Sequence, residues 1–245
     1  MKKGLNKSQI ERFSRQLVLK NIGPKGQKKI LSSKVLIVGI GGLGCPAAEN
    51  LVRAGIGTIG LVDNDIVNLS NIHRQSLFNS KDVKKLKVSV AAKKLKEINP
   101  LTKIKTYKSR LTKKNIENII KNYEIIIDGS DNFKTKFLIN DYCLKLKKKL
   151  ITGAISKFDG HIFTFDFKDK KTASLKNFYQ EKEISEDILN CEFEGVLGTT
   201  ASIVGTTQAN EALKMIVKIG QNLKNQILII DLLNLNFRKV KFKKR

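Results

Sequence analysis

Tryptophan is absent from this 245-residue sequence, and cysteine is scarce, with three residues. Cys45, Cys143 and Cys191 are too few and too far apart for a disulfide framework, and no two of them form a C-x-x-C pair. This spacing excludes the common structural zinc sites. Because so few cysteines are typical of a reducing compartment, we expect the protein in the cytoplasm.

Long apolar runs are also missing. No stretch approaches the roughly 18 consecutive apolar residues of a membrane span. Residues 1–7 lead into mixed polar sequence rather than the apolar core of a signal peptide. We therefore expect neither membrane insertion nor export. The 41% of hydrophobic residues still suffices to bury a substantial core.

Acidic residues are few, since 22 Asp and Glu face 47 Lys and Arg and the formal net charge is +25. Such a charge suggests a basic nucleic-acid-binding protein. However, 40 of the basic residues are lysine and only 7 are arginine, which makes the bidentate contacts to phosphates and bases. Lysine, isoleucine and asparagine are all abundant, as drift in an AT-rich genome would produce. We favour this explanation and expect no nucleic-acid partner.

Short apolar runs alternate with amphipathic stretches in the first 152 residues. The runs predict strands, and the stretches predict helices. Expected strands lie at residues 35–38, 59–62, 104–107, 125–127 and 150–152, and expected helices at 46–54, 82–98, 115–123 and 133–146. Continuous apolar runs are typical of strands buried on both faces. The alternation therefore predicts an α/β fold, a Rossmann-like, doubly wound, mostly parallel sheet.

The second half changes to a period of two. Strands are expected at residues 160–165, 227–230 and 237–242, a helix at 199–219, and a long loop at 168–196. We expect antiparallel strands that extend the same sheet. No linker or repeat interrupts the chain, so residues 1–245 are predicted to form one domain, with a nucleotide-binding half at about 30–155 and a closing half at about 156–245.

A helix is also predicted near the N-terminus. Ser8 and Glu11 have the spacing of a capping box, and Phe13 and other apolar residues follow at helical intervals. Gly23 and Pro24 predict the end of this helical region.

Gly39, Gly41 and Gly44 form the pattern G-x-G-x-x-G between an expected strand and an expected helix. Glycines allow the backbone to approach a phosphate, and the helix N-terminus offers free N–H groups. Asp63 ends the next strand, 19 residues after Gly44, where a carboxylate can accept hydrogen bonds from ribose hydroxyls. The pattern predicts a nucleotide site rather than a tight turn without a ligand.

An NAD-dependent dehydrogenase is one interpretation of such a site. Such an enzyme needs an acid or base for hydride transfer, usually a histidine or a Tyr-x-x-x-Lys pair. The sequence has only two histidines and no such pair, so it supplies no chemistry for this reaction. Cations and amides stabilise charge on a phosphate, and a carboxylate can hold Mg²⁺. The candidates for nucleotidyl or phosphoryl transfer are Arg15, Asn71, Arg74, Lys87 and Asp131.

These residues lie in motifs that resemble those of the MoeB/ThiF family, the bacterial relatives of ubiquitin-activating enzymes. The motifs are RFSRQ (12–16), VGIGGLG (38–44), DND (63–65), LSNIHRQ (69–75) and DGSDN (128–132), continued by EGVLG (194–198) and QANEALK (208–214). They follow in order over nearly the whole chain and are far more specific than a single glycine loop.

The resemblance implies an enzyme that adenylylates a ubiquitin-like sulfur-carrier protein ending in Gly-Gly. The carrier's C-terminal carboxylate would attack the α-phosphate of Mg·ATP, pyrophosphate would leave and an acyl-adenylate would remain. The small subunit of molybdopterin synthase is the expected carrier. One alternative is the same reaction on the sulfur carrier for the thiazole of thiamine. Another is that the protein is a tRNA-modifying dehydratase of the same superfamily.

The resemblance also assigns roles to residues of this sequence. The backbone around the nucleotide would come from Gly39, Gly41, Gly42 and Gly44. Asp63 would hold the ribose, with Asp65 also at the nucleotide.

The resemblance also implies side chains that bind the phosphates of the nucleotide and their metal ion. Asn71, Arg74 and Lys87 would contact them, and Asp131, beside Asn132, would hold Mg²⁺.

Two further residues carry expectations about assembly and sulfur chemistry. The resemblance implies a homodimer in which Arg15 reaches into the partner subunit's site. Cys191 lies in the long loop, where a cysteine of related enzymes bonds to the activated carrier or handles persulfide; an inert thiol is the alternative.

Many relatives hold zinc with two C-x-x-C pairs, one after the strand near residue 165 and one near the C-terminus. Residues 166–182 contain no cysteine and the last residues contain none, so zinc is not expected. The sequence shows no rhodanese domain, so a separate protein is expected to donate the sulfur.

Overall fold

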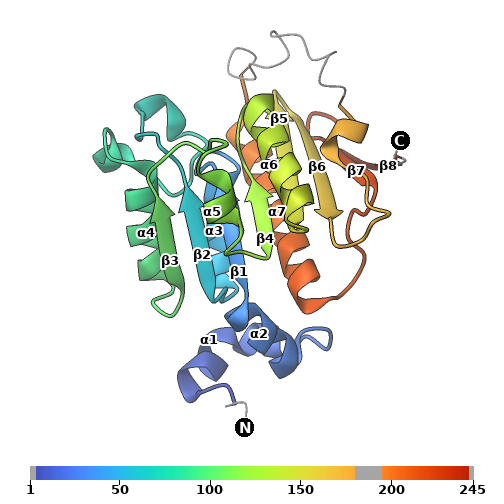
Figure 1. Cartoon of the computed structure of the whole chain (residues 1–245). Helices are drawn as coiled ribbons and strands as arrows, with labels where there is room; N and C mark the ends of the chain where they lie inside the picture. Colours follow the sequence, from blue (N-terminus) through green and yellow to red (C-terminus); the bar gives the residue numbers. More distant parts are fainter. Residues whose placement is uncertain (1–3, 180–194, 243–245) are drawn as a thin grey trace.

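An eight-stranded sheet runs through the computed structural model, which describes residues 4–179 and 195–242 (Figure 1). Its strand order is β3-β2-β1-β4-β5-β6-β7-β8. The strands are β1 (Lys34–Val38), β2 (Thr58–Val62), β3 (Lys103–Tyr107), β4 (Ile125–Asp128), β5 (Lys149–Ser156), β6 (Asp159–Asp166), β7 (Gln226–Asp231) and β8 (Asn236–Lys241). Strands β1 to β5 pair in parallel, and β5 to β8 pair antiparallel. The predicted fold class is therefore confirmed.

Helices cover both faces of the sheet. They are α3 (Gly44–Arg53), α4 (Lys87–Ile98), α5 (Ile116–Ile120), α6 (Phe133–Lys145) and α7 (Gly198–Val217), whereas α1 (Lys7–Leu17) and α2 (Gly23–Ser32) lie at one end of the sheet (Figure 1). The buried side chains of α3, α4 and α7 belong to one apolar cluster, and those of α5 and α6 to another. The sheet lies between the two clusters.

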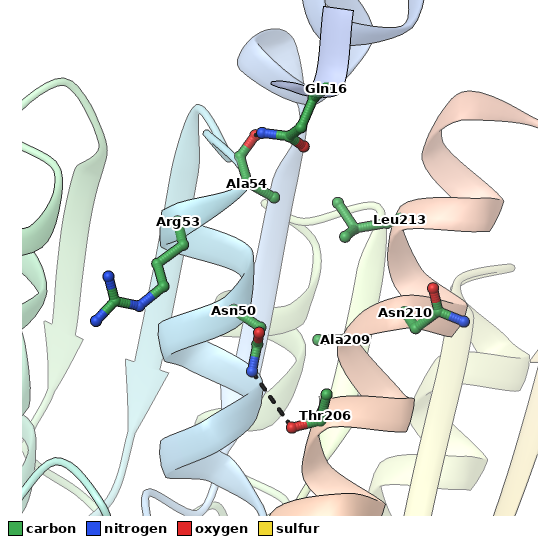
Figure 2. Close-up of a pocket in the computed structure, with 8 residues that line it drawn as sticks. All are labelled: Gln16, Asn50, Arg53, Ala54, Thr206, Ala209, Asn210 and Leu213. Atoms are coloured by element: carbon green, nitrogen blue, oxygen red, sulfur yellow. Dashed lines mark hydrogen bonds between the residues drawn. The ribbon is translucent and has the colours of Figure 1, made fainter. Parts of the chain in front are cut away.

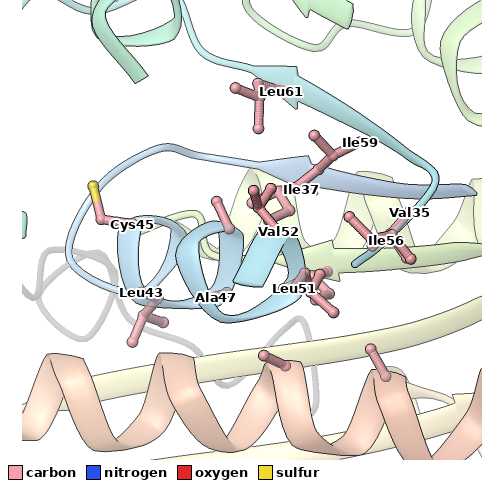
Figure 3. Packing of buried hydrophobic residues seen from close by; sticks show 14 of the residues in the cluster. Val35, Ile37, Leu43, Cys45, Ala47, Leu51, Val52, Ile56, Ile59 and Leu61 are labelled. Carbon is pink, nitrogen blue, oxygen red and sulfur yellow. The ribbon is translucent and has the colours of Figure 1, made fainter. Parts of the chain in front are cut away.

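Strand β1 shows why the central strands read as unbroken apolar runs. Val35 and Ile37 belong to the cluster under α3, whereas Leu36 and Val38 belong to the cluster under α6. Figure 3 shows Val35 and Ile37 packed with residues of β2 and α3. Because successive side chains point to opposite faces, a strand that is covered on both faces needs apolar residues at every position.

The N-terminal region corrects two predictions. The capping box is formed by Asn6 and Gln9 rather than by Ser8 and Glu11, and α1 begins at Lys7. Asn6 is the better cap because its side chain accepts from the Gln9 N–H while its own N–H is bound by Gln9. Gly23 and Pro24 begin a second helix, α2. Pro24 occupies its first turn, where the missing N–H costs no hydrogen bond.

The helix predicted from residue 82 begins only at Lys87. Asp82 belongs to a short 3₁₀ helix, and Lys84 has a φ of 69° that breaks the helical path. A bridge between Ile66 and Leu86 holds residue 86 in extended backbone. This pairing joins residues far apart in the sequence, so hydrophobic periodicity could not reveal it.

An aromatic cluster joins β6 to the end of the chain. It consists of Phe163 on β6, Phe178 and Tyr179 after the 3₁₀ helix Leu175–Asn177, and Phe242 after β8. The Phe163 ring centroid lies 5.0 Å from that of Phe178 and 5.9 Å from those of Tyr179 and Phe242. These rings join two segments that lie far apart in the sequence.

Among residues 4–179 and 195–242, no helix combines the length and the apolar character needed to cross a membrane.

We expect Phe178→Ala to lower the free energy of unfolding by about 2 kcal/mol, because its ring pairs with three others in the aromatic cluster. Phe158→Ala is the matched control, since Phe158 is 38% exposed, against 37% for Phe178, and has no ring contact among the described residues. Its cost should stay below about 1 kcal/mol. Urea denaturation of both variants measures the difference, and equal losses would contradict a stabilising role of the cluster.

Candidate nucleotide site

The predicted glycine loop lies where the sheet changes winding direction. Strands β1 and β4 are neighbours, but α3 leaves β1 on one face and α6 leaves β4 on the other. Ligands of doubly wound sheets bind at the carboxyl ends of such strand pairs. The loop therefore occupies the expected position for a nucleotide site.

The four glycines of the loop have two different functions. A Cβ on Gly44 would lie 1.9 Å from the Gly39 carbonyl oxygen, and one on Gly39 would lie 2.8 Å from the Gly129 oxygen. Gly39 also has a φ of 84°. These two glycines are required by the close approach of the chain to itself.

Gly41 and Gly42 face a more open environment. A Cβ on Gly41 would meet only the Gln75 amide nitrogen, at 3.6 Å, and one on Gly42 would lie 3.1 Å from Ala201 and 3.6 Å from the Arg74 stem. Chain packing alone does not require glycine at position 41. A ligand that approaches the backbone there would require it.

Asp63 lies directly after β2 and against the glycine loop. One of its carboxylate oxygens accepts from the Ile40 N–H at 2.7 Å, and the other accepts from the Asp65 N–H at 2.8 Å. Burial raises the pKa of this carboxyl, while these N–H groups and the Lys87 charge act in the opposite direction. Each oxygen retains a lone pair that a ribose hydroxyl could use.

Lys87 is brought to the same place from the start of α4. Its ammonium is 3.2 Å from Asp65 Oδ2, and its N–H donates to the Asp65 carbonyl at 3.0 Å. The Lys87 side chain is only 7% exposed, whereas that of Asp65 is 57% exposed. Asp65 is therefore the counter-ion of a buried lysine, in addition to its predicted place near the nucleotide.

Arg74 lies over Gly42, and its guanidinium has only neutral acceptors in the described part of the chain. Nη1 donates to the Ser70 carbonyl at 3.1 Å and to the His73 ring at 2.8 Å. Asn71 ends the adjacent 3₁₀ helix Leu69–Asn71, and its Oδ1 accepts from the Asn68 N–H. Arg74 thus provides positive charge beside the glycine loop, and no carboxylate of residues 4–179 or 195–242 pairs with it.

Sequence analysis missed Gln75. This side chain is 3% exposed, and its Oε1 has no hydrogen-bond partner among the described residues. Its Nε2 is the atom nearest to a Cβ built on Gly41, at 3.6 Å. The sequence signal for Gln75 as a site residue was its position directly after Arg74. Its burial could not be predicted, because it is one polar residue in a polar loop.

Asp131 and Asn132 lie in the loop after β4. Asp131 is exposed, and Asn132 Nδ2 donates to its Oδ1 at 3.0 Å. Asn132 caps α6 by accepting from the Thr135 N–H at 2.9 Å. The structure thus places both residues at the carboxyl end of β4, beside the strand that carries the glycine loop.

Helix α7 closes the other side of the loop. A Cβ on Gly198 would lie 2.4 Å from the His73 carbonyl, and one on Gly205 would lie 2.3 Å from the Leu43 carbonyl. The start of α7 therefore packs directly on the segments that carry Arg74 and the glycines.

Arg15 is not brought to this site in its own chain. Its neighbours Arg12 and Gln16 donate to the carbonyls of Ile98 and Ala54, at the ends of α4 and α3. Figure 1 shows α1 at the end of the sheet opposite to the loops after β1 and β4. Cys191 lies outside the described residues.

The remaining cysteines lie in the interior of the protein. Both Cys45 and Cys143 are free and buried. Burial raises the pKa of the Cys45 thiol to about 12, although this residue lies directly after the glycine loop. It therefore packs as a small apolar side chain.

A shallow pocket of about 340 Å³ lies between α3 and α7. It is lined by residues that include Gln16, Asn50, Arg53 and Asn210, and Asn50 donates to Thr206 across it at 3.3 Å (Figure 2). None of the lining residues belongs to the glycine loop. The pocket is therefore distinct from the predicted nucleotide site.

Comparison with known proteins gives a consistent result. The ThiF family model matches residues 13–245. The chain is 40% identical over 237 residues to a probable molybdopterin-synthase adenylyltransferase of Gracilaria tenuistipitata var. liui. The match covers 97% of this chain and 66% of the relative. It is 37% identical to a sulfur carrier protein adenylyltransferase of Thermus thermophilus, over 96% of this chain and 88% of the relative.

Longer relatives match over a smaller share of their length. An adenylyltransferase and sulfurtransferase MOCS3 of Drosophila virilis is 39% identical over 98% of this chain but 53% of its own. Among solved structures, E. coli MccB with ATP has a TM-score of 0.83 at 22% identity, over 96% of this chain and 72% of MccB. PaaA has a TM-score of 0.83 at 23% identity, over 100% of this chain and 77% of PaaA. These two structures show the shared fold.

Exchange of single glycines tests the two functions within the loop. We expect Gly44→Ala to lower the free energy of unfolding by about 3 kcal/mol, because its Cβ would overlap the Gly39 carbonyl. Gly41→Ala should change it by less than about 0.5 kcal/mol, because its Cβ has room. Thermal unfolding without ligand measures both, and a similar loss at both positions would contradict the assignment.

Proposed function

The chain belongs to the ThiF family, and we propose that it is an ATP-dependent adenylyltransferase for the C-terminal Gly-Gly carboxylate of a ubiquitin-like sulfur-carrier protein. The observation that carries this proposal is the convergence of Arg74 and Lys87 on an open glycine loop at the carboxyl edge of the sheet. Two relatives that match over most of this chain are named for this reaction.

The reaction joins two anions and therefore needs cations between them. A carboxylate oxygen of the carrier attacks the α-phosphorus and forms a new P–O bond. The bond from the α-phosphorus to the bridging oxygen breaks, and pyrophosphate leaves with the electron pair. The product is a mixed anhydride, the acyl-adenylate. In this chain Arg74, Lys87 and Asn71 would contact the phosphates, Asp63 would hold the ribose, and the backbone at Gly41 and Gly42 would approach the nucleotide.

Magnesium belongs to the same proposal. The described residues contain no group of three or more His, Cys, Asp or Glu that could hold a metal ion. Mg²⁺ in nucleotide sites is commonly bound by one or two carboxylates together with the phosphates. Exposed Asp131, with Asn132 bound to it, fits that donor set. When bound, the ion would neutralise phosphate charge.

The carrier is proposed to be the small subunit of molybdopterin synthase, supported by the name of the Gracilaria relative. A separate sulfur donor is also proposed. This is supported by the name of the Thermus relative, a sulfur carrier protein adenylyltransferase. Cys191 remains a candidate for covalent chemistry with the activated carrier.

We further propose that residues 1–245 act as one domain in a cytoplasmic homodimer. The continuous sheet across both halves supports one domain. The position of Arg15 at the opposite end of the sheet supports the dimer, since this side chain would reach a nucleotide site only in the partner subunit.

We expect Asp131→Ala to lower carrier-dependent ATP–pyrophosphate exchange by about 100-fold or more, because the exposed carboxylate at the phosphates is lost. Asp141→Ala is the control. Asp141 is an exposed carboxylate on α6, the helix that follows the loop of Asp131, and it pairs with Lys176. Its loss should leave exchange within about twofold of wild type. Retained exchange in the Asp131 variant would contradict the proposal.

Mixed dimers test whether Arg15 acts in the partner's site. Co-expressed Arg15→Ala and Asp131→Ala chains should regain about a quarter of wild-type exchange, because half of the dimers are mixed and each of these has one complete site. A mixture of Arg74→Ala and Asp131→Ala chains should regain nothing, since both residues lie in one chain's site. Differently tagged chains show that mixed dimers have formed. If both mixtures then regain the same exchange activity, Arg15 does not act in the partner subunit's site.

A further inference from the structure

A buried charge pair lies beneath the loop that carries Asp131. Asp128, the last residue of β4, is 0% exposed, and Lys136, in the second turn of α6, is 4% exposed. Their side chains form an ion pair at 3.3 Å. Neither residue contacts the nucleotide in the proposed function, so their burial needs another explanation.

The Asp128 carboxylate is fully hydrogen-bonded. Oδ2 accepts from the Thr152 hydroxyl at 2.5 Å as well as from Lys136, and Oδ1 accepts from the N–H and the hydroxyl of Ser130 at 2.9 and 2.6 Å. Lys136 also donates to the Gly153 carbonyl at 2.6 Å. One side chain thus connects β4, the loop after it, α6 and β5.

Lys136 occupies a position that is unfavourable for a lysine. It is buried near the N-terminal end of α6, where the partial charge of the helix is positive and cations are disfavoured. A buried lysine needs a paired anion, which Asp128 provides. The pair therefore specifies how α6 joins the end of β4.

The geometry of the loop follows from these contacts. Asp128 holds Ser130, the Gly129 N–H donates to Val38 at 2.8 Å, and a Cβ on Gly129 would lie 3.2 Å from both the Gly39 oxygen and the Gly44 nitrogen. At the other end of the loop Asn132 caps α6. Asp131 is the exposed residue between these two fixed points.

We propose that the Asp128–Lys136 pair is a positioning device for Asp131, so that Lys136 sets the affinity for magnesium-bound ATP without touching it. This inference rests on the proposed function for the role of Asp131. Loss of Lys136 would leave a buried carboxylate without a cationic partner, and the turn through Ser130 would shift to let water reach it. Asp131 would then no longer be held where the phosphates and their cation bind.

The test compares the binding of α,β-methylene-ATP by titration calorimetry with and without Mg²⁺. In Lys136→Met we expect the Kd with Mg²⁺ to rise about tenfold, the usual effect of losing a group that orients a metal ligand. The Kd without Mg²⁺ should change by less than about twofold, because the glycine loop, Arg74 and Lys87 remain. Lys136→Arg should stay within about twofold of wild type, because a guanidinium can also donate to Asp128 and Gly153.

Lys214→Met is the matched control. Lys214 pairs with Glu211, a carboxylate that is 3% exposed and that keeps hydrogen bonds from Asn222 and Leu223 when the lysine is lost. This pair lies in the C-terminal half of α7, away from the glycine loop. The control variant should lose stability without a change in either Kd.

Two results would overturn the proposal: an unchanged Kd with Mg²⁺ in folded Lys136→Met, or an equal rise in both Kd values, which would show a general structural role. If Lys136→Met does not fold, Thr152→Val decides, because it removes one donor to Asp128 and should raise only the Kd with Mg²⁺, by about threefold. If wild-type protein binds the nucleotide but shows no ATP–pyrophosphate exchange in the presence of the carrier, the proposed reaction is refuted. The comparison of Kd values remains valid in that case.

Discussion

The close approach of two backbone segments, after β1 and after β4, is the constraint on which the candidate site depends. Gly39, Gly44 and Gly129 lie so near one another that a side chain on any of them would contact main-chain atoms of another. The contact is possible because α3 and α6 leave their strands on opposite faces of the sheet. It leaves Gly41 and Gly42 free of this packing and places Asp131 on the neighbouring strand end, so the same constraint that closes the core also forms the nucleotide crevice.

The central fold was predictable because burial on both faces leaves a direct record in the sequence. Ile125, Ile126 and Ile127 are all buried, and a run of this kind fits a covered parallel strand. The glycine loop and Asp63 were predictable for a similar reason, since their roles depend on local spacing. The register of β1 against β4 and the position of Arg15 depend on contacts between distant segments, which local patterns do not record.

The residues that sequence analysis missed share one property, which is that their meaning depends on a partner. Lys136 is one of 40 lysines, and nothing in its neighbourhood distinguishes it from a solvated surface residue. Its burial becomes understandable only when β4, β5 and α6 bring Asp128, Thr152 and the Gly153 carbonyl around it. Gln75 follows the same rule, and so does the pairing of Asp65 with Lys87, because the two residues were predicted separately and their contact depends on the fold.

The net charge of +25 also has a different meaning once these pairs are known. Lys87 and Lys136 are each paired with an aspartate of the chain, which compensates part of their positive charge. Arg74 differs, because its acceptors in the described part of the chain are a carbonyl and a neutral ring nitrogen, and neither compensates its charge. An anion at the glycine loop would supply that compensation. The local information about the ligand therefore comes from one arginine in a chain with seven, rather than from the excess of lysine. That excess acts at longer range, because a net charge of this sign attracts acidic partners towards the protein.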